Sequence, residues 1–467
     1  MTLARWWTSG QPRPPSLPPA AGNAGLPGSR AVDAPHGSSP DGKDEASGPR
    51  YTEAVTTSAP IVLLFANPEG DEARAYGEAA RRVGVGLRVV PEPSGAALDP
   101  AGADAVLRDL DGVAVAGVLV AGPRAAWIAA TVARACGVAW HAPEAVAVAT
   151  DRLLTRGRWL ATGLPTPWFV GLATRGDDDL DRLGRIRLPC VVAASDTTAA
   201  TGVVRAASWE DLMAARSAIG AGLDARGDTA DEGADARLLV EGLVPGVGFV
   251  LDGVLEQGAL RVFALFEEVD ADRATPPARL YVSPARMAPA RQQVVAGHVA
   301  RAALALGLHQ GPIHATCRVD GDVVIVLAVA PCPPAWHLAR ALPVVAPDRT
   351  RCAYEDVLLA HALGRPLDHY GHQAIASGVL VVDAVAAGGL TSLDGQEAVS
   401  RLPWVTGVEV AARRGDPQGP GPGGRSPAAT VYAQGAQPDD VIATLEDAAR
   451  RLQVGVQPPT RTATSTS

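Results

Sequence analysis

Aromatic residues make up only 4% of this 467-residue sequence and charged residues only 19%, whereas 47% of it is hydrophobic. A core built mainly from Ala, Val and Leu is therefore expected. No uninterrupted apolar run reaches the ~18 residues of a membrane-spanning helix, and the first residues hold no apolar stretch of signal-peptide length. The net charge of −9 provides no general basic surface for nucleic acid or an anionic membrane. We expect a cytoplasmic protein that contacts neither.

Cysteine is scarce, and dinucleotide-binding motifs are absent. The five cysteines are scattered without a CxxC pair, which fits a reducing compartment better than a disulfide framework. No G-x-G-x-x-G follows the first predicted strand, so a dinucleotide site is not expected there. Fifty glycines and 39 prolines favour α/β units with many turns and disordered ends.

Hydrophobic periodicity predicts an α/β (α+β) protein made of several packed parts. Residues 71–86 have the spacing of an amphipathic helix, and residues 138–144 are predicted as the last strand of a small doubly wound unit. Ser208 and Asp211 have the spacing of a capping box that starts a helix. We divide the chain into a disordered leader (1–57), an α/β unit (58–146), a central domain (147–345, in halves of about 147–235 and 236–345), a C-terminal α+β lobe (346–456) and a disordered tail (457–467).

The most informative stretch is residues 311–342, which begins Gly311-Pro312-Ile313-His314-Ala315. It predicts two strands joined by a tight turn and followed by a Pro-rich segment. The pattern resembles the metal-binding strand pair of ATP-grasp ligases, G-P-h-H-A-E-h-R-h, a turn, then h-h-E-h-A-x-R. The order of segments over roughly 58–456 is similar to that of carboxylate–amine ligases of the L-amino-acid (dipeptide) ligase type. The resemblance implies an ATP-grasp fold with an N-terminal Rossmann-like pre-ATP-grasp domain, and ATP and Mg²⁺ as cofactors.

Several positions that carry charge in that family do not carry it here. The two metal-binding glutamates and the following arginine correspond to Thr316, Ala328 and Cys332, and a phosphate-binding lysine corresponds to Ala193. Of the glycine-rich phosphate loop only Gly202 remains. Cys332 has no basic neighbour in sequence to lower its thiol pKa, so we do not expect it to act as a nucleophile. The resemblance therefore implies a degenerate site with no metal ligands and no confident catalytic residue.

Other positions in the resemblance keep candidate nucleotide-binding residues. Arg152 either contacts phosphate or is an ordinary solvated helix arginine, and Arg156 follows it on the same helix. Glu241 either reads the edge of an adenine or is a strand-end carboxylate. His314 is either a site residue or a satisfied core histidine. At Glu268 the family has lysine, so a side chain there that faced phosphates would oppose ATP.

Three functions remain open at this stage. One is a catalytically impaired paralogue that binds a small carboxylate, an amino acid or a nucleotide, or that partners an active ligase. Another is an active ATP-dependent carboxylate–amine ligase that forms an amide through an acyl phosphate. The last is a purely structural subunit, and by resemblance the chain is a candidate homodimer.

Overall fold

The computed structural model describes residues 60–93, 98–176, 180–199, 202–224, 237–269, 278–383, 388–410, 417–418 and 427–457. The leader expected at 1–57 and, apart from Gln457, the tail expected at 457–467 lie outside these ranges. Residues from Ala59 onward form one compact unit, to which all the elements below belong. Among the described residues, no helix is both long and apolar enough to cross a membrane.

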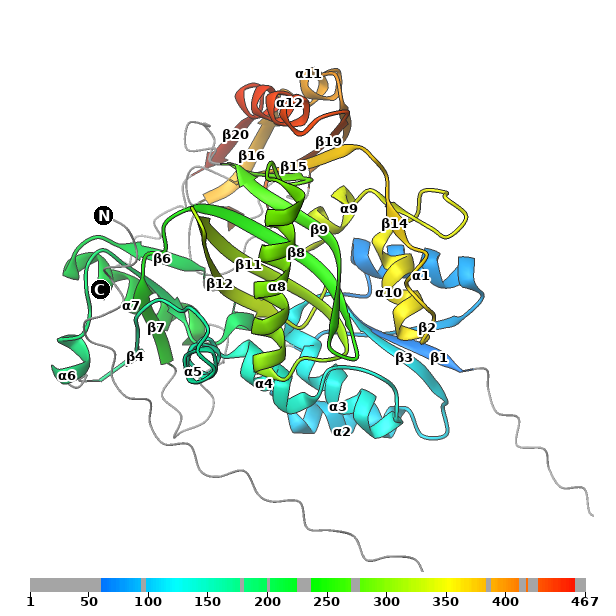
Figure 1. Cartoon of the computed structure of the whole chain (residues 1–467), viewed down its shortest axis with the longest axis horizontal. Helices are drawn as coiled ribbons and strands as arrows, with labels where there is room; N and C mark the ends of the chain where they lie inside the picture. The colour runs from blue at the N-terminus through cyan, green and yellow to red at the C-terminus, as the bar shows by residue number, and fades with distance from the viewer. Residues whose placement is uncertain are drawn as a thin grey trace, which may run out of the picture. The chain divides into compact units, whose positions relative to one another are not determined.

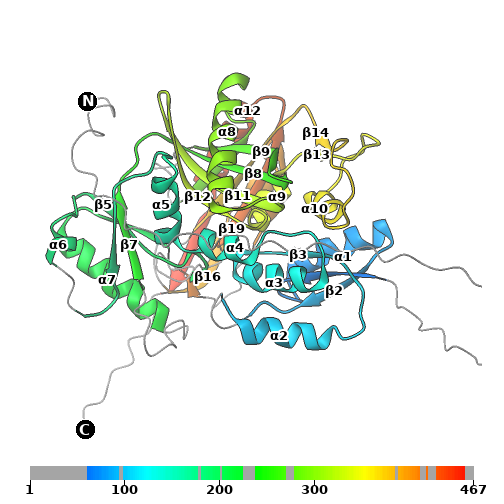
Figure 2. The same ribbon diagram turned by 60° about the horizontal axis from the view of Figure 1, so that its bottom comes forward.

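The N-terminal part is a parallel sheet in the order β2-β1-β3, with helices on both faces (Figure 2). Alternate residues of β1 point to opposite faces, so Val62 packs towards α1 and α10 whereas Leu63 packs towards α3. The prediction of a strand at 138–144 is wrong: residues 138–142 belong to no strand, and Pro143 starts a helix because proline suits the first helical turn. The elements are β1 (Ile61–Phe65), α1 (Asp71–Val83), β2 (Gly86–Val90), α2 (Pro100–Asp109), β3 (Val115–Val120), α3 (Ala126–Cys136) and α4 (Pro143–Thr150).

A second, antiparallel sheet has the order β4-β7-β5-β6. Helix α7 covers one of its faces with a core of aliphatic residues. The expected capping box is confirmed, because Ser208 Oγ accepts from the Asp211 amide at 3.1 Å and Asp211 Oδ2 accepts from the Ser208 amide at 3.0 Å. The elements are α5 (Arg152–Ala161), β4 (Phe169–Ala173), α6 (Leu180–Leu183), β5 (Cys190–Ala194), β6 (Val203–Ala206), α7 (Trp209–Asp224) and β7 (Arg237–Gly242).

The largest sheet has eight strands in the order β12-β11-β8-β9-β10-β15-β19-β17. Helix α8 runs across one face (Figure 1). Val295 and Val299 of this helix share a buried core with Phe249, Leu251 and Cys317 of the sheet. We call this the α8 face. The elements are β8 (Val247–Glu256), β9 (Ala259–Val269), β10 (Ala278–Ser283), α8 (Pro289–Leu306), β11 (Gly311–Asp320), β12 (Val323–Ala330), β15 (Ala376–Val382), β17 (Val405–Glu409) and β19 (Ala429–Gly435).

We call the face opposite to α8 the site face; it is formed by β8, β9, β11 and β12. Val250 and Phe266 lie on it and join the core formed with α1, α9 and α10. Further along the sheet, α12 packs on β10, β15 and β19. The remaining elements are α9 (Trp336–Ala341), β13 (Val344–Val345), α10 (Tyr354–Ala362), β14 (Gly371–His372), β16 (Gly388–Asp394), α11 (Gln396–Ser400), β18 (Pro417–Gln418), α12 (Pro438–Arg451) and β20 (Gln453–Gln457).

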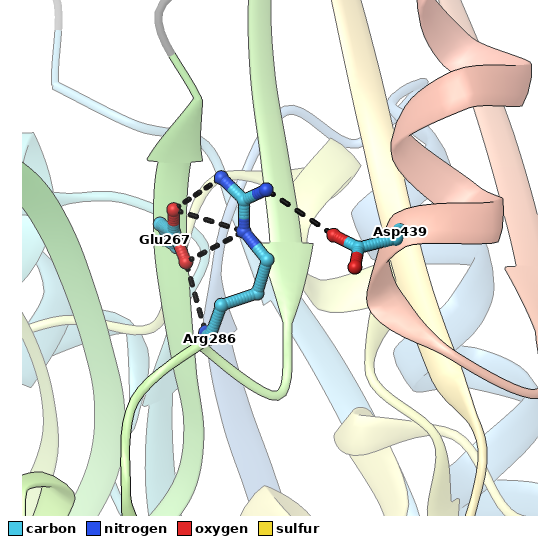
Figure 3. Close-up of polar contacts among 3 residues, drawn as sticks. All are labelled: Glu267, Arg286 and Asp439. Atoms are coloured by element: carbon cyan, nitrogen blue, oxygen red, sulfur yellow. Dashed lines mark hydrogen bonds and ion pairs between the residues drawn. The ribbon is translucent and has the colours of Figure 1, made fainter.

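An ionic contact joins the large sheet to α12. Arg286, in the connection between β10 and α8, binds buried Glu267 of β9 at 2.6 Å and exposed Asp439 of α12 at 3.2 Å (Figure 3). The Arg286 amide also donates to Glu267 Oε2 at 2.8 Å. The buried carboxylate is thus compensated by a charge and by a backbone donor, as buried carboxylates generally are.

Candidate nucleotide and metal site

The strand pair β11–β12 places the two expected metal positions directly opposite each other. Thr316 pairs with Ala328, and His314 pairs with Ala330, all on the site face. Thr316 and Ala328 are both half-buried, so a ligand can reach the surface between them. Neither side chain carries the carboxylate that Mg²⁺ requires. Among the described residues, no group of three His, Cys, Asp or Glu could hold a metal ion.

A bulge beside this pair provides a backbone carbonyl that binds Arg156. The register shifts after Thr316, so Leu327 has no partner on β11 and its carbonyl accepts from Arg156 Nη1 at 2.8 Å. The same guanidinium binds Glu241 of β7 through two hydrogen bonds, at 2.7 and 3.1 Å. Arg156 is 1% exposed and also stacks on Trp159. Arg156 and Glu241 are thus brought together, and they satisfy each other while linking the two antiparallel sheets.

Arg152 fastens the start of α5 to the end of β5. Its Nη1 donates to the carbonyls of Ala194 at 2.7 Å and Asp196 at 3.3 Å, and its backbone amide donates to Ser195. Burial and the nearby Arg156 lower the pKa of the Arg152 guanidinium. The side chain is held by main-chain carbonyls of the segment in which the phosphate loop was expected.

The described part of that loop is occupied by its own hydrogen bonds. Asp196 Oδ1 accepts from both the amide and the hydroxyl of Thr198, each at 2.7 Å, and Thr197 Oγ1 donates to the Thr150 carbonyl. Gly202 has φ +76°, which glycine adopts without strain, and open space around its Cα. Ala193 is buried on the same face of the small sheet as Glu241, because Ala193 pairs with Leu239 two residues before it.

His314 is held by a carboxylate that the sequence did not single out. Asp252 lies opposite His314 on β8, is completely buried, and accepts from His314 Nδ1 at 2.7 Å. Burial opposes charge on the imidazole, but the Asp252 charge and hydrogen bond prevail and raise the pKa of His314. The available signal was one aspartate inside the otherwise apolar strand sequence of β8.

Glu268 and Cys332 differ in their relation to the site face. Glu268 pairs with Gly248, and its carboxylate fills the space that a side chain at position 248 would occupy. It therefore lies on the site face, whereas Glu267 points to the α8 face. Cys332 is 3% exposed among apolar residues, and burial, followed by Asp252 and Glu92, raises its thiol pKa. A thiol in that setting stays protonated, so it is a poor nucleophile.

Two cavities of about 560 and 600 Å³ lie elsewhere in the described structure. The first is bounded by α8 and residues 372–376 and has no charged side chain in its lining. The second lies between α1, α9 and α10 and contains Arg82, paired with Asp356. Neither is lined by any candidate residue of the strand pair or of α5.

A family model described as an ATP-grasp domain matches residues 186–336, which include β5, β6 and β7 of the four-stranded sheet and the strands β8 to β12 of the eight-stranded sheet. This chain carries an ATP-grasp domain. The expected fold is confirmed: an ATP-grasp fold with an N-terminal parallel sheet followed by antiparallel sheets. No curated protein matches the sequence.

Solved structures support the fold of the ATP-grasp domain and its flanking parts. An L-amino acid ligase from Bacillus licheniformis is 19% identical, with a TM-score of 0.70 over 86% of this chain and 99% of that one. A phosphoribosylglycinamide synthetase from Anaerococcus prevotii is 11% identical, with a TM-score of 0.58 over 85% and 100%. An Aspergillus clavatus carboxyaminoimidazole ribonucleotide synthase complexed with ATP is 14% identical, with a TM-score of 0.60 over 84% and 99%.

Proposed function

We propose that this chain is an ATP-grasp protein of the carboxylate–amine ligase type whose metal-dependent ligase step is impaired, and that it acts by binding a small carboxylate, an amino acid or a nucleotide. One observation carries the proposal: uncharged Thr316 and Ala328 face each other across β11 and β12 on the site face. An active ligase as its binding partner remains compatible with this role.

The residues present do not fit a Mg²⁺ ion. Asp252 lies on the site face but is fully buried and bound by His314. Glu268 lies beside Gly248, the partner of Arg318 and not of Thr316. Mg²⁺ favours near-octahedral oxygen coordination that includes one or two accessible carboxylates. Thr316 offers only a hydroxyl, so no reaction step is assigned to a metal in this chain.

The size of the expected loss supports impairment. Removing one preorganised charged donor costs about 3–4 kcal/mol of transition-state stabilisation, a factor of ~10²–10³. At Ala193, Thr316, Ala328 and Cys332 the chain has uncharged residues at four positions where the family has charge. Their effects are not additive, but even one such loss would bring a typical turnover of about 10 s⁻¹ to below about 0.1 s⁻¹.

The test is to restore the two carboxylates. Thr316→Glu/Ala328→Glu should create Mn²⁺ binding, measured by electron paramagnetic resonance, that the unchanged chain lacks. A matched control is Val294→Glu/Leu304→Glu, which adds the same charge on the exposed side of α8. Tight Mn²⁺ binding and amino-acid-dependent ADP release by the unchanged chain would overturn the proposal and indicate an active ligase.

A further inference from the structure

Hydrogen-bond donors occupy alternate positions along the site face of β11. His314, Thr316 and Arg318 stand at every second residue, so their side chains leave the strand on the same side. All three are half-buried. Arg318 Nη1 is anchored on the Gly246 carbonyl at 2.8 Å. Neither Thr316 Oγ1 nor His314 Nε2 has a hydrogen-bond partner in the described part of the chain.

The charge state of His314 follows from Asp252. A carboxylate that is 0% exposed needs compensation, and its Oδ2 has no partner among the described residues. Among the described residues, the hydrogen bond from His314 Nδ1 to Oδ1 is the one hydrogen bond that the Asp252 carboxylate accepts. A proton on His314 turns the contact into an ion pair and leaves the imidazolium, with a side chain 23% exposed, facing the site.

Three titratable groups that interact electrostatically with His314 or Asp252 carry no negative charge at pH 7. Burial, together with Arg279 and His314 itself, lowers the pKa of His337 on α9 to about 4, so that ring is neutral at pH 7. Burial and Asp252 raise the pKa of the Tyr354 hydroxyl on α10, and the Cys332 thiol also stays protonated. Burial and Glu72 raise the pKa of Glu92, after β2, although Arg124 opposes this.

Glu268 of β9 is another acid on the site face. It lies over Gly248, which pairs with Arg318 at the opposite end of the donor row from His314. Glu268 acts against an anion at the Arg318 end, where it offsets the charge of Arg318, so an incoming anion is favoured at the His314–Thr316 end.

We propose that His314 and Thr316 form a metal-independent oxyanion site, in which the imidazolium Nε2 and the threonine hydroxyl bind a carboxylate or phosphate group and buried Asp252 positions and charges the imidazole. This deepens the proposed function, on which it rests, by naming the ligand chemistry of the same site. Thr316 then contributes a donor to an anion at a position where a glutamate would hold a cation. Loss of the metal site and gain of an anion site have the same structural cause.

The test is histidine-selective ¹³C NMR of the full chain in EDTA, titrated with inorganic phosphate and, separately, with acetate. The His314 signal, assigned by its loss in His314→Gln, should titrate above the ordinary histidine midpoint and shift saturably with one or both anions. Phosphate alone would indicate a nucleotide or phosphorylated ligand, and acetate alone a carboxylic acid. Affinity should fall as pH rises through the His314 midpoint, because the neutral ring has lost its charge.

Variants separate anion binding from a structural role. His314→Gln should weaken binding about tenfold or more, the share expected of a charge-assisted hydrogen bond. Thr316→Val should weaken it with the His314 titration unchanged, whereas Asp252→Asn should lower the His314 midpoint. His298→Gln on α8 is the matched control and should leave binding unchanged.

Two results would overturn the oxyanion site. One is the absence of saturable shifts with either anion in EDTA, and the other is anion binding unaffected by His314→Gln and Thr316→Val. Thr316→Val replaces a half-buried side chain with one of nearly the same shape, so this variant should fold. The test therefore stays decisive even if Asp252→Asn does not fold. Failure of the oxyanion site would appear as absent or unaffected anion binding in EDTA. Failure of the proposed function would appear differently, as Mn²⁺ binding and ADP release by the unchanged chain.

Discussion

Removal of the Arg156 side chain should destabilise the protein strongly. It is 1% exposed, binds both oxygens of Glu241, and donates to the Leu327 carbonyl at 2.8 Å. Arg156→Met keeps most of the side-chain volume next to Trp159 but leaves Glu241, whose side chain is 13% exposed, without its counter-charge. Breaking a buried pair from one side costs about 3–5 kcal/mol, since the remaining charge stays desolvated.

The expected loss can be measured as a change in melting temperature. For a cooperative unit of the size of Ala59–Ser467, 3–5 kcal/mol corresponds to roughly 4–6 °C. Differential scanning fluorimetry should show that fall for Arg156→Met, and hydrogen exchange should increase in both β7 and β12. The double variant Arg156→Met/Glu241→Leu should recover much of the loss because no charge is left buried. If Arg156→Met melts within 1 °C of the unchanged protein, or the double variant is as unstable as the single one, the contact does not stabilise the junction of the two sheets.

Three further outcomes follow from buried charged or titratable groups. Arg286→Ala should increase hydrogen exchange in α12 and destabilise the protein by ~2–3 kcal/mol, because buried Glu267 loses its counter-charge. Asp439→Asn changes a side chain that is 82% exposed and should leave the stability nearly unchanged. Burial lowers the pKa of His141 and of His361 to about 4. Between pH 6.5 and 4 the unfolded chain therefore binds protons that the folded protein does not. Acid denaturation curves should show the free energy of unfolding decreasing by on the order of a few kcal/mol as the pH falls through that range. Thiol titration of the native protein should leave Cys332 unmodified until the protein unfolds.

The fold was predictable because its signals are local. The apolar alternation and tight turn of 311–330 predict the β11–β12 hairpin, and Ser208 with Asp211 predicts the start of α7. The strand at 138–144 failed because an extended apolar segment does not by itself specify a pairing partner, and Pro143 favours a helix start instead. The domain boundaries beyond this remain predictions.

The candidate site was predictable in its positions but not in its pairings. Thr316 and Ala328 were identified from the resemblance of residues 311–342 to the ATP-grasp strand pair, and the register shows that they face each other. That Arg156 binds Glu241, 85 residues later, depends on how two sheets meet, and no local pattern contains that information. Asp252 was missed for the same reason: its partner His314 is 62 residues away, and a single aspartate within an apolar strand has no periodic signal.

The central claim is that this ATP-grasp domain has lost its metal-dependent chemistry while keeping a site face able to bind small anions. Isothermal titration calorimetry with ATP, with and without Mg²⁺, on the full chain tests it most directly. The account predicts that Mg²⁺ does not strengthen ATP binding and that amino acids do not induce ADP release. Mg²⁺-dependent tightening of about tenfold or more, about 1.4 kcal/mol or more, together with amino-acid-dependent ADP release, would contradict it.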